Sequence, residues 1–287
     1  MRGILLACVV VGMVGLSGVM GVASEEALHR IQQAEALHAA RYAQEVMTQI
    51  IDLYEAVLPD LPTLDVQSQS FVLNRLSQLC YEATTLTEDP SDEDETWFER
   101  GKAYGLQSLR LNPAFAEAED RSFAEAVSYA NDPAALHWTA SNWGKLCGLH
   151  PIQGLIEQDQ VLALFTRCVE IDPEYWGGST MSSLGSLLIM LPEALGGDDE
   201  AGLQLIEDSI ALDPTYLPNH VILAEYWGFT YNYFGALVGV RDAALIEQEL
   251  AAVLASEAVD VWPFWNRNAQ RNAKKLLDQL DDMEQAD

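Results

Sequence analysis

The stretch "IALDPTY" (residues 210–216) is written three times in this chain with small changes. The other copies are "VEIDPEY" (169–175) and "LRLNPAF" (109–115). Aligned on Pro113, Pro173 and Pro214, each copy has a small side chain five residues before the proline and an aromatic ring two residues after it. These positions are Ser108, Cys168 and Ser209, then Phe115, Tyr175 and Tyr216. A proline ends a helix, so the pattern predicts three helix ends with matched surroundings.

The small residues allow two helices to pack closely, and the aromatic ring can anchor the next helix. This combination is typical of tetratricopeptide-type helical hairpins, in which each proline ends the second helix of a pair. The prolines lie 41 and 60 residues apart, whereas a regular array repeats every 34 residues or so. We therefore expect degenerate hairpins in a compact bundle rather than a regular solenoid.

The rest of the chain predicts an all-α fold. Apolar residues recur at steps of three and four, and no alternating strand pattern or hairpin turn is evident. The predicted helices are 26–58, 67–87, 95–111, 114–130, 133–148, 157–171, 175–191, 198–212, 216–235, 242–256 and 263–281.

The N-terminal segment predicts export. One positive charge precedes the apolar run "ILLACVVVGMVGLSGVMGVA" (4–23), which ends in small residues before the polar "SEEALHR". We interpret 1–23 as a signal peptide, 24–287 as a single helical domain and the location as the periplasm. A retained membrane anchor is the alternative. Cys8 lies too early in the run for a well-placed lipobox.

The charge of the chain excludes some partners. With 15 basic and 44 acidic residues, the net charge is −29, which disfavours nucleic acid and anionic membrane surfaces.

Motifs for a zinc protease, a serine hydrolase or a phosphate-binding loop are missing, so we expect neither an enzyme nor a cofactor. Cleavage would leave three cysteines, which argues against a disulfide framework, although a Cys147–Cys168 bridge stays open. The glycines of "LGGDDEAGL", Gly196 and Gly197, predict a turn before a helix capped by Asp198 or Asp199.

Aromatic residues offer the best candidate site. Trp138 and Trp143 lie five residues apart on one predicted helix, so they point about 140° away from each other, computed from 3.6 residues per turn. Rings in such stripes are commonly core, and the functional alternative is an apolar pocket with a few polar groups. The candidate ligand-binding residues are Trp138, Asn142, Trp143, Tyr175, Asn219, His220, Tyr226 and Trp227.

Three segments resemble one family. They are "AALHWTASNWGKLCGL" (134–149), "MLPEALGGDDEAGLQLIEDSIALDPTYLPNHVILAEYW" (190–227) and "WNRNAQRNAKKLLDQLDDM" (265–283). They resemble the T component of tripartite ATP-independent periplasmic (TRAP) transporter systems. The resemblance implies a helical periplasmic subunit, a trimer that associates with the TRAP solute-binding subunit and holds a small apolar ligand in a cleft or tunnel. The alternative is a general tetratricopeptide-type scaffold in envelope assembly.

Overall fold

The computed structural model describes residues 22–86, 92–232 and 235–286 and confirms the all-α class. The predicted signal segment 1–23 lies outside the described residues except for Val22 and Ala23, which begin α1. Part of the acidic segment 88–95 also lies outside them. One short β-hairpin accompanies the helices in the described part of the chain.

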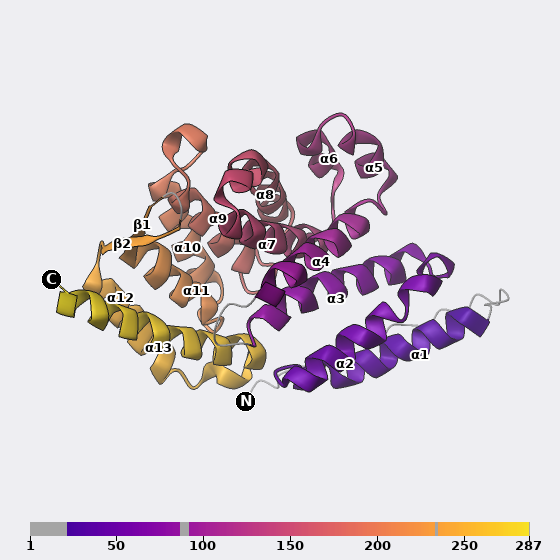
Figure 1. The fold of residues 1–287 in the computed structure, drawn as a ribbon, viewed down its shortest axis with the longest axis horizontal. Helices are drawn as coiled ribbons and strands as arrows, with labels where there is room; N and C mark the ends of the chain where they lie inside the picture. Colours follow the sequence, from indigo (N-terminus) through magenta and orange to yellow (C-terminus); the bar gives the residue numbers. More distant parts are fainter. Residues whose placement is uncertain (1–21, 87–91, 233–234, 287) are drawn as a thin grey trace.

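Three helical hairpins form the centre of the molecule. They pair α3 (Val66–Thr84) with α4 (Asp92–Leu109), α7 (Pro133–Leu149) with α8 (Pro151–Ile171), and α9 (Ser179–Met190) with α10 (Asp199–Leu212). Each copy of the repeated ending follows the second helix of a pair, as predicted. Helix α7 also packs on α4, and α9 packs on α8, so that consecutive hairpins stack (Figure 1).

Glycine permits the close backbone contact between α9 and α10. A Cβ atom added at Gly202 of α10 would lie 2.6 Å from the carbonyl oxygen of Gly185 in α9, and one added at Gly185 would lie 2.5 Å from that of Gly202. A side chain at either position would therefore separate the two helices.

Shorter elements complete the fold on both sides of the hairpins. On the N-terminal side are α1 (Val22–Leu37), the 3₁₀ segments η1 (His38–Ala40) and η2 (Leu58–Thr63), and α2 (Gln44–Glu55). In the middle are α5 (Pro113–Glu119), α6 (Phe123–Tyr129) and η3 (Glu193–Leu195). The C-terminal part comprises α11 (Pro218–Ile222), the π-helix η4 (Leu223–Gly228), β1 (Phe229–Tyr231), β2 (Leu237–Val240), α12 (Ala243–Ala255), η5 (Ala258–Asp260) and α13 (Pro263–Ala286).

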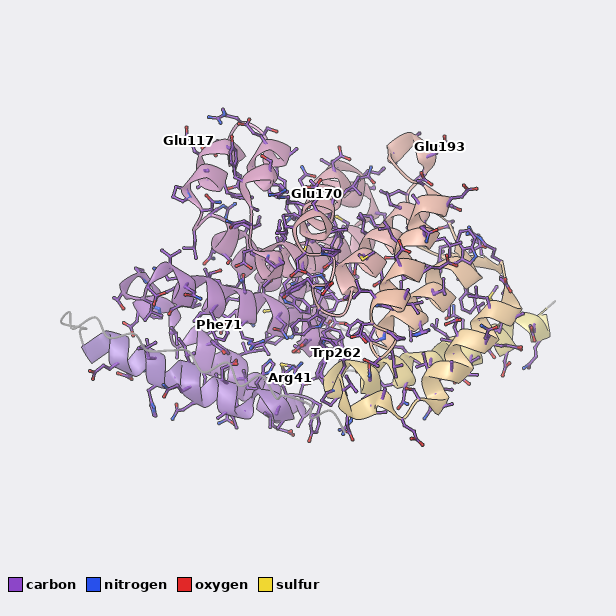
Figure 2. The ribbon with its side chains drawn as sticks, turned by 180° about the vertical axis from the view of Figure 1, so that it is seen from behind. Arg41, Phe71, Glu117, Glu170, Glu193 and Trp262 are labelled. Atoms are coloured by element: carbon purple, nitrogen blue, oxygen red, sulfur yellow. The ribbon has the colours of Figure 1, made fainter. Side chains whose placement is uncertain are left out.

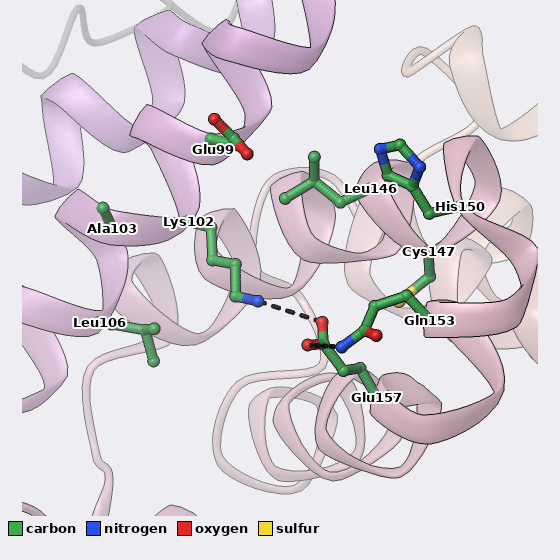
Figure 3. Close-up of a pocket in the computed structure, with 9 residues that line it drawn as sticks. All are labelled: Glu99, Lys102, Ala103, Leu106, Leu146, Cys147, His150, Gln153 and Glu157. Atoms are coloured by element: carbon green, nitrogen blue, oxygen red, sulfur yellow. Dashed lines mark hydrogen bonds and ion pairs between the residues drawn. The ribbon is translucent and has the colours of Figure 1, made fainter.

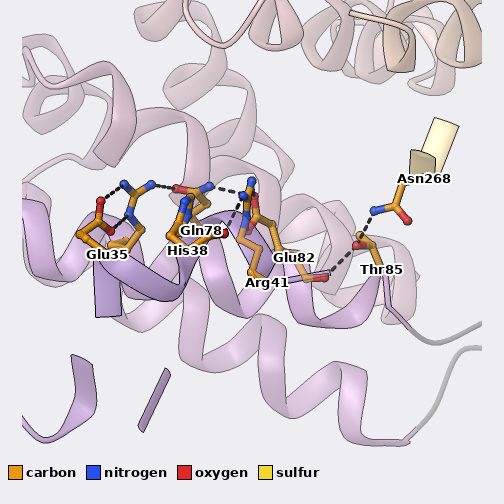
Figure 4. A network of polar contacts seen from close by, with 8 residues as sticks. Glu35, His38, Arg41, Gln78, Glu82, Thr85 and Asn268 are labelled. Atoms are coloured by element: carbon orange, nitrogen blue, oxygen red, sulfur yellow. Dashed lines mark hydrogen bonds and ion pairs between the residues drawn. The ribbon is translucent and has the colours of Figure 1, made fainter. Parts of the chain in front are cut away.

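The prediction of one helix over 26–58 is wrong. The chain turns after η1, where Ala43 is extended (φ −95°, ψ 129°), and α2 packs back against α1. Long-range polar contacts hold this turn (Figure 4): the guanidinium of Arg41 donates to both carboxylate oxygens of Glu82 at 2.6 and 3.1 Å. Glu82 is fully buried, and Gln78 also donates to it at 2.8 Å. No glycine or proline marks the break, because tertiary contacts determine it.

The prediction of one helix over 114–130 is also wrong. The chain forms α5 and α6, separated at residues 120–122. The Ser122 side chain accepts a hydrogen bond from the backbone N–H of Glu125 and caps α6. Ser122 and Glu125 have the spacing of a capping box, a signal that could have located this break.

The prediction of one helix over 216–235 is wrong as well. So is the expectation that this part of the chain contains no strands. This segment forms α11 and η4, and then β1 pairs antiparallel with β2, placing Phe229 opposite Val240. The helix ends where Gly228 packs against Ile246 of α12: an added Cβ would lie 2.3 Å from the Ile246 side chain. Phe229 is fully buried at this point. The β-branched and aromatic residues that follow Gly228 favour strands, as their composition could have indicated.

Candidate ligand site at an aromatic cluster

Seven aromatic side chains meet where α3, α7, α13 and three inter-helix turns come together. We call them the aromatic cluster: Tyr81, Trp138, Tyr175, Trp176, Tyr216, Trp262 and Trp265. The Trp138 ring lies 6.0 Å from Tyr81, 5.2 Å from Trp176 and 6.0 Å from Trp265, measured between centroids. Trp262 joins the cluster at 5.8 Å from Trp176 and 5.1 Å from Tyr216.

The repeated endings supply two of these rings. Tyr175 and Tyr216 are the aromatic residues after Pro173 and Pro214, which themselves follow the ends of α8 and α10. The indole of Trp138 donates a hydrogen bond to the Tyr175 hydroxyl at 3.1 Å. Burial raises the pKa of both tyrosines well above the usual value, so both phenols are neutral donors and acceptors.

Trp176 enters the cluster from an uncommon backbone conformation. Its φ is +55°, and Gly177 and Gly178 follow at +64° and +75°. A left-handed conformation costs a side-chain-bearing residue about 1–2 kcal/mol. The turn delays the start of α9 to Ser179, later than the predicted 175, and directs the Trp176 ring toward Trp138. Strain of this kind is common at ligand sites.

Trp265 carries an unused hydrogen-bond donor. Its side chain is 9% exposed, and its Nε1–H has no hydrogen-bond partner. The indole of Trp262, by contrast, donates to Asp213 Oδ2 at 3.0 Å. A buried donor without a partner costs about 1–3 kcal/mol, so an acceptor on a ligand would be favoured here. Tyr81, Trp176 and Trp262 are only half-buried, which leaves the edge of the cluster accessible.

Charged groups border the cluster near Tyr81. Lys145 lies seven residues after Trp138, on the same face of α7, and is exposed. The phenols of Tyr81 and Tyr226 and the carboxylate of Glu225 raise the pKa of Lys145. Burial raises the pKa of the Glu225 carboxyl, while Lys145 opposes this effect. Near Tyr81, Lys145 therefore stays protonated at neutral pH, while burial of Glu225 favours the neutral form of its carboxyl group.

Two of the predicted ligand residues, Asn142 and Asn219, hold the backbone. Asn142 is fully buried, and its amide donates to the carbonyl oxygens of Trp138 at 2.7 Å and Ser77 at 3.0 Å. Asn219 is also fully buried; its amide donates to the Gly177 carbonyl at 2.9 Å. Asn142 thus joins α7 to α3, and Asn219 supports the strained turn below Trp176.

Trp143 lies at a different site, beside a pocket of about 360 Å³ that opens between α4, α7 and α8. Lys102 and Glu157 are among the residues that line this pocket (Figure 3). Lys102 Nζ is 3.6 Å from the centroid of the Trp143 ring and 3.2 Å from Glu157 Oε2. The Trp143 indole donates to the same carboxylate. The Trp143 ring therefore contacts both members of the Lys102–Glu157 ion pair.

The remaining predicted residues lie near η4. His220 is hydrogen-bonded to Glu249 at 2.7 Å, and the guanidinium of Arg241 lies 4.3 Å from the Trp227 ring centroid. Tyr226 lies 6.1 Å from Tyr231. Neither of the two described pockets is lined by any of the eight predicted ligand residues. Of the eight predicted residues, Trp138 and Tyr175 belong to the aromatic cluster, and Asn142 contacts the Trp138 backbone from within α7.

The turn at residues 196–198 begins with a residue in the left-handed backbone conformation. Gly196 has φ +90°, and Asp198 caps α10 by accepting from the Ala201 N–H at 2.9 Å. A Cβ atom at Gly197 would lie 1.7 Å from the Leu191 carbonyl oxygen, so that position requires glycine.

Sequence reasoning missed Tyr81, Trp176, Trp262 and Trp265 as members of one site. Trp176 precedes two glycines, a sequence signal for an unusual turn. Tyr81 lies on α3, whereas Trp262 and Trp265 lie just before and at the start of α13, far from Tyr81 and Trp138 in the chain.

Other chemistry has no support in the described residues. They contain no group of three His, Cys, Asp or Glu side chains arranged to hold a metal ion. Cys80, Cys147 and Cys168 are free thiols, so the Cys147–Cys168 bridge does not form. No helix in the described ranges combines the length and apolar character needed to cross a bilayer.

A family model described as TRAP transporter T-component matches residues 68–283. The chain belongs to the TRAP transporter T-component family. No curated protein matches it. The match confirms the resemblance and makes this T-component part of a TRAP transporter system. It includes the three hairpins and every residue of the aromatic cluster, whereas α1 and α2 precede it.

Proposed function

We propose that this T-component is a periplasmic binding and assembly subunit that holds the apolar part of an elongated solute at the aromatic cluster. It would exchange that solute with the solute-binding subunit of the same TRAP system, without covalent chemistry. The subunit would act as a trimer and reach the periplasm through a cleaved signal peptide, residues 1–23. Family membership supports the transport context, and the cluster supports the ligand.

The observation that carries the ligand proposal is the unpaired Nε1–H of Trp265 among large apolar rings. Aromatic walls with few polar groups are typical of small-molecule sites, in which the polar groups orient the ligand. Trp265 would donate to one acceptor of the solute, and the half-buried rings of Tyr81 and Trp176 would contact its apolar body.

Native mass spectrometry of the purified mature chain tests the ligand. We expect a bound small molecule whose occupancy falls on the order of 10-fold in Trp265→Phe, because this change removes a donor and keeps the ring. Trp97→Phe is the matched control, since Trp97 lies on α4 outside the cluster. An empty wild-type chain, or equal occupancy in Trp265→Phe, would reject the site.

The same spectra test the assembly. We expect three copies per particle, and a complex when the cognate solute-binding subunit is added. A monomer that ignores this subunit would contradict the assembly proposal and leave the ligand result standing.

One observation favours the second candidate, a scaffold for envelope assembly. Four aliphatic side chains at the end of α7 and the start of α8 are strongly exposed beside the pocket between α4, α7 and α8: Leu149, Ile152, Leu155 and Ile156. Exposed apolar patches commonly bind a partner helix. For a scaffold, Ile152→Glu with Ile156→Glu would abolish partner binding, and Trp265→Phe would have no effect on any function.

A further inference from the structure

The positive charges of this acidic chain are distributed unevenly. Of the 15 lysines and arginines, Arg2 lies outside the described residues, and nine of the other 14 form ion pairs within the chain. Arg267, Arg271 and Lys274, all on α13, have no carboxylate within 4.0 Å in the described part of the chain. We call these three residues the basic stripe.

The stripe lies on the side of the amphipathic helix α13 that faces away from the C-terminal core. Its residues follow the spacing i, i+4 and i+7, which places them on one side of α13. The buried side of the helix carries Ala269, Ala273, Leu276 and Leu280, which belong to the C-terminal core. Arg267 and Lys274 are exposed, and Arg271 is half-buried. Asp260 precedes the stripe and Asp278 follows it, so the positive surface extends over two turns.

A small pocket adjoins the stripe. It has a volume of about 220 Å³ and is lined by Tyr42, Leu86, Phe264, Arg267, Asn268 and Arg271. Arg271 donates from Nη2 to the Thr85 carbonyl and to Asn268 Oδ1, while its Nε is buried without a hydrogen-bond partner. The guanidinium of Arg267 lies 5.2 Å from the Tyr42 ring centroid. Such a pocket has room for one carboxylate side chain, which could accept from both guanidinium groups.

We propose that the basic stripe is the surface on which this T-component docks an acidic patch of the solute-binding subunit, with one carboxylate of that partner entering the pocket. This inference rests on the proposed function. The net charge of −29 makes nearly every other surface repel such a patch, which selects one docking orientation. Charges more than about 8 Å away are screened at physiological salt, so the local cations dominate at contact. Helix α13, which carries the stripe, lies in the lower half of the molecule with the labelled Arg41 and Trp262, whereas Glu117 and Glu193 lie at the opposite edge (Figures 1 and 2).

The experiment measures binding of the mature chain to its cognate solute-binding subunit by biolayer interferometry at low and high salt. We expect Arg267→Gln with Lys274→Gln to weaken binding on the order of 10-fold at low salt and to flatten the salt dependence. Arg110→Gln with Arg121→Gln changes the net charge equally, in the α4–α5 and α5–α6 turns, and should bind as wild type. Thermal unfolding of each variant verifies the fold.

The outcomes separate the two proposals. Wild-type binding that persists in the stripe variant would overturn the docking surface and leave the partnership intact. A wild-type chain that does not bind the solute-binding subunit at all would overturn both. Equal weakening in the control would also overturn the stripe, because the effect would then follow net charge.

Discussion

Trp138 and Trp143 both lie on helix α7, yet their side chains pack in two different environments. Trp138 is 2% exposed and faces aromatic rings from α3, α13 and the strained turn at Trp176. Trp143 is 7% exposed, packs edge-on against Phe123 and carries the Lys102–Glu157 ion pair above its ring. Both donate an indole hydrogen bond, one to a neutral phenol and the other to a carboxylate.

This difference teaches that residue type and helix position do not define a ligand site. Five residues along a helix rotate a side chain by about 140°, enough to place it between different neighbours. The cluster side is apolar and contains an unused donor at Trp265, whereas the pocket side is charged and its donors are satisfied. The ligand proposal therefore concerns the Trp138 side.

The largest expected effect is on the cluster side. Trp138→Ala should lower the free energy of unfolding by about 5 kcal/mol, the upper end for such truncations, because four neighbouring rings lose their contact. Urea unfolding followed by circular dichroism measures the change. A loss smaller than that of Trp143→Ala would contradict the cluster as the better-packed region.

Trp143→Ala should lower the free energy of unfolding by less, about 3 kcal/mol, because the long side chains of Lys102 and Glu157 can move into the space left by the ring. Helix content should be retained in circular dichroism. Ligand occupancy in native mass spectra should match wild type. Loss of the ligand in this variant would move the site to the α4–α7–α8 pocket.

Acid should affect the cluster side through His137. Its ring lies 4.6 Å from Trp138, and burial lowers its pKa from 6.5 to about 3. The unfolded chain binds this proton below pH 6.5 and the folded chain does not, so stability is lost as pH falls from 6.5 toward 3. At pH 5 the expected loss is about 2 kcal/mol from this group.

The matched variants isolate that contribution, because His38, whose pKa burial also lowers to about 2, acts in the same direction. His137→Gln should reduce the difference in unfolding free energy between pH 7.5 and pH 5, whereas exposed His29→Gln should preserve it. An unchanged pH dependence in His137→Gln would show that the ring is protonated in the folded chain.

The smallest effect should come from the pocket side. Lys102→Met removes a cation that is 22% exposed and lies over Trp143 beside Glu157. Partly exposed ion pairs and cation–π contacts contribute about 0.5–1 kcal/mol. Salt should reduce the difference between this variant and wild type in urea unfolding. A loss above about 2 kcal/mol would indicate that the pair holds α4 to α8.

The repeated endings were informative because their physics is local. A proline prevents the preceding helix from continuing through it, and small residues before it allow a partner helix to approach, so the three hairpins followed from residues 109–115, 169–175 and 210–216. Asn142 and Asn219 are buried amides with partners, as their residue type suggested: Asn142 donates to backbone carbonyls, and Asn219 donates to the Gly177 carbonyl and accepts from the Ser182 hydroxyl at 2.8 Å.

Three features had no sufficient local signal. The break after His38–Ala40 depends on the Arg41–Glu82 contact, across 41 residues. The convergence of Tyr81, Trp138 and Trp265 joins three helices that no spacing rule relates. The segment after Gly228 had strand-forming composition, yet Ile246 of α12 determines where its helix must end.

The amino-acid sequence by itself determined the helical class, the positions of the three hairpin ends, the strong negative charge and the family. These properties depend on residues close together in the chain or on composition. Only the tertiary structure decided that Trp138 faces the aromatic cluster, that Trp265 keeps a free donor and that Arg267, Arg271 and Lys274 form one stripe without a carboxylate partner among the described residues. Such properties depend on which distant side chains come within hydrogen-bond or ion-pair distance, and that follows from packing rather than from local sequence.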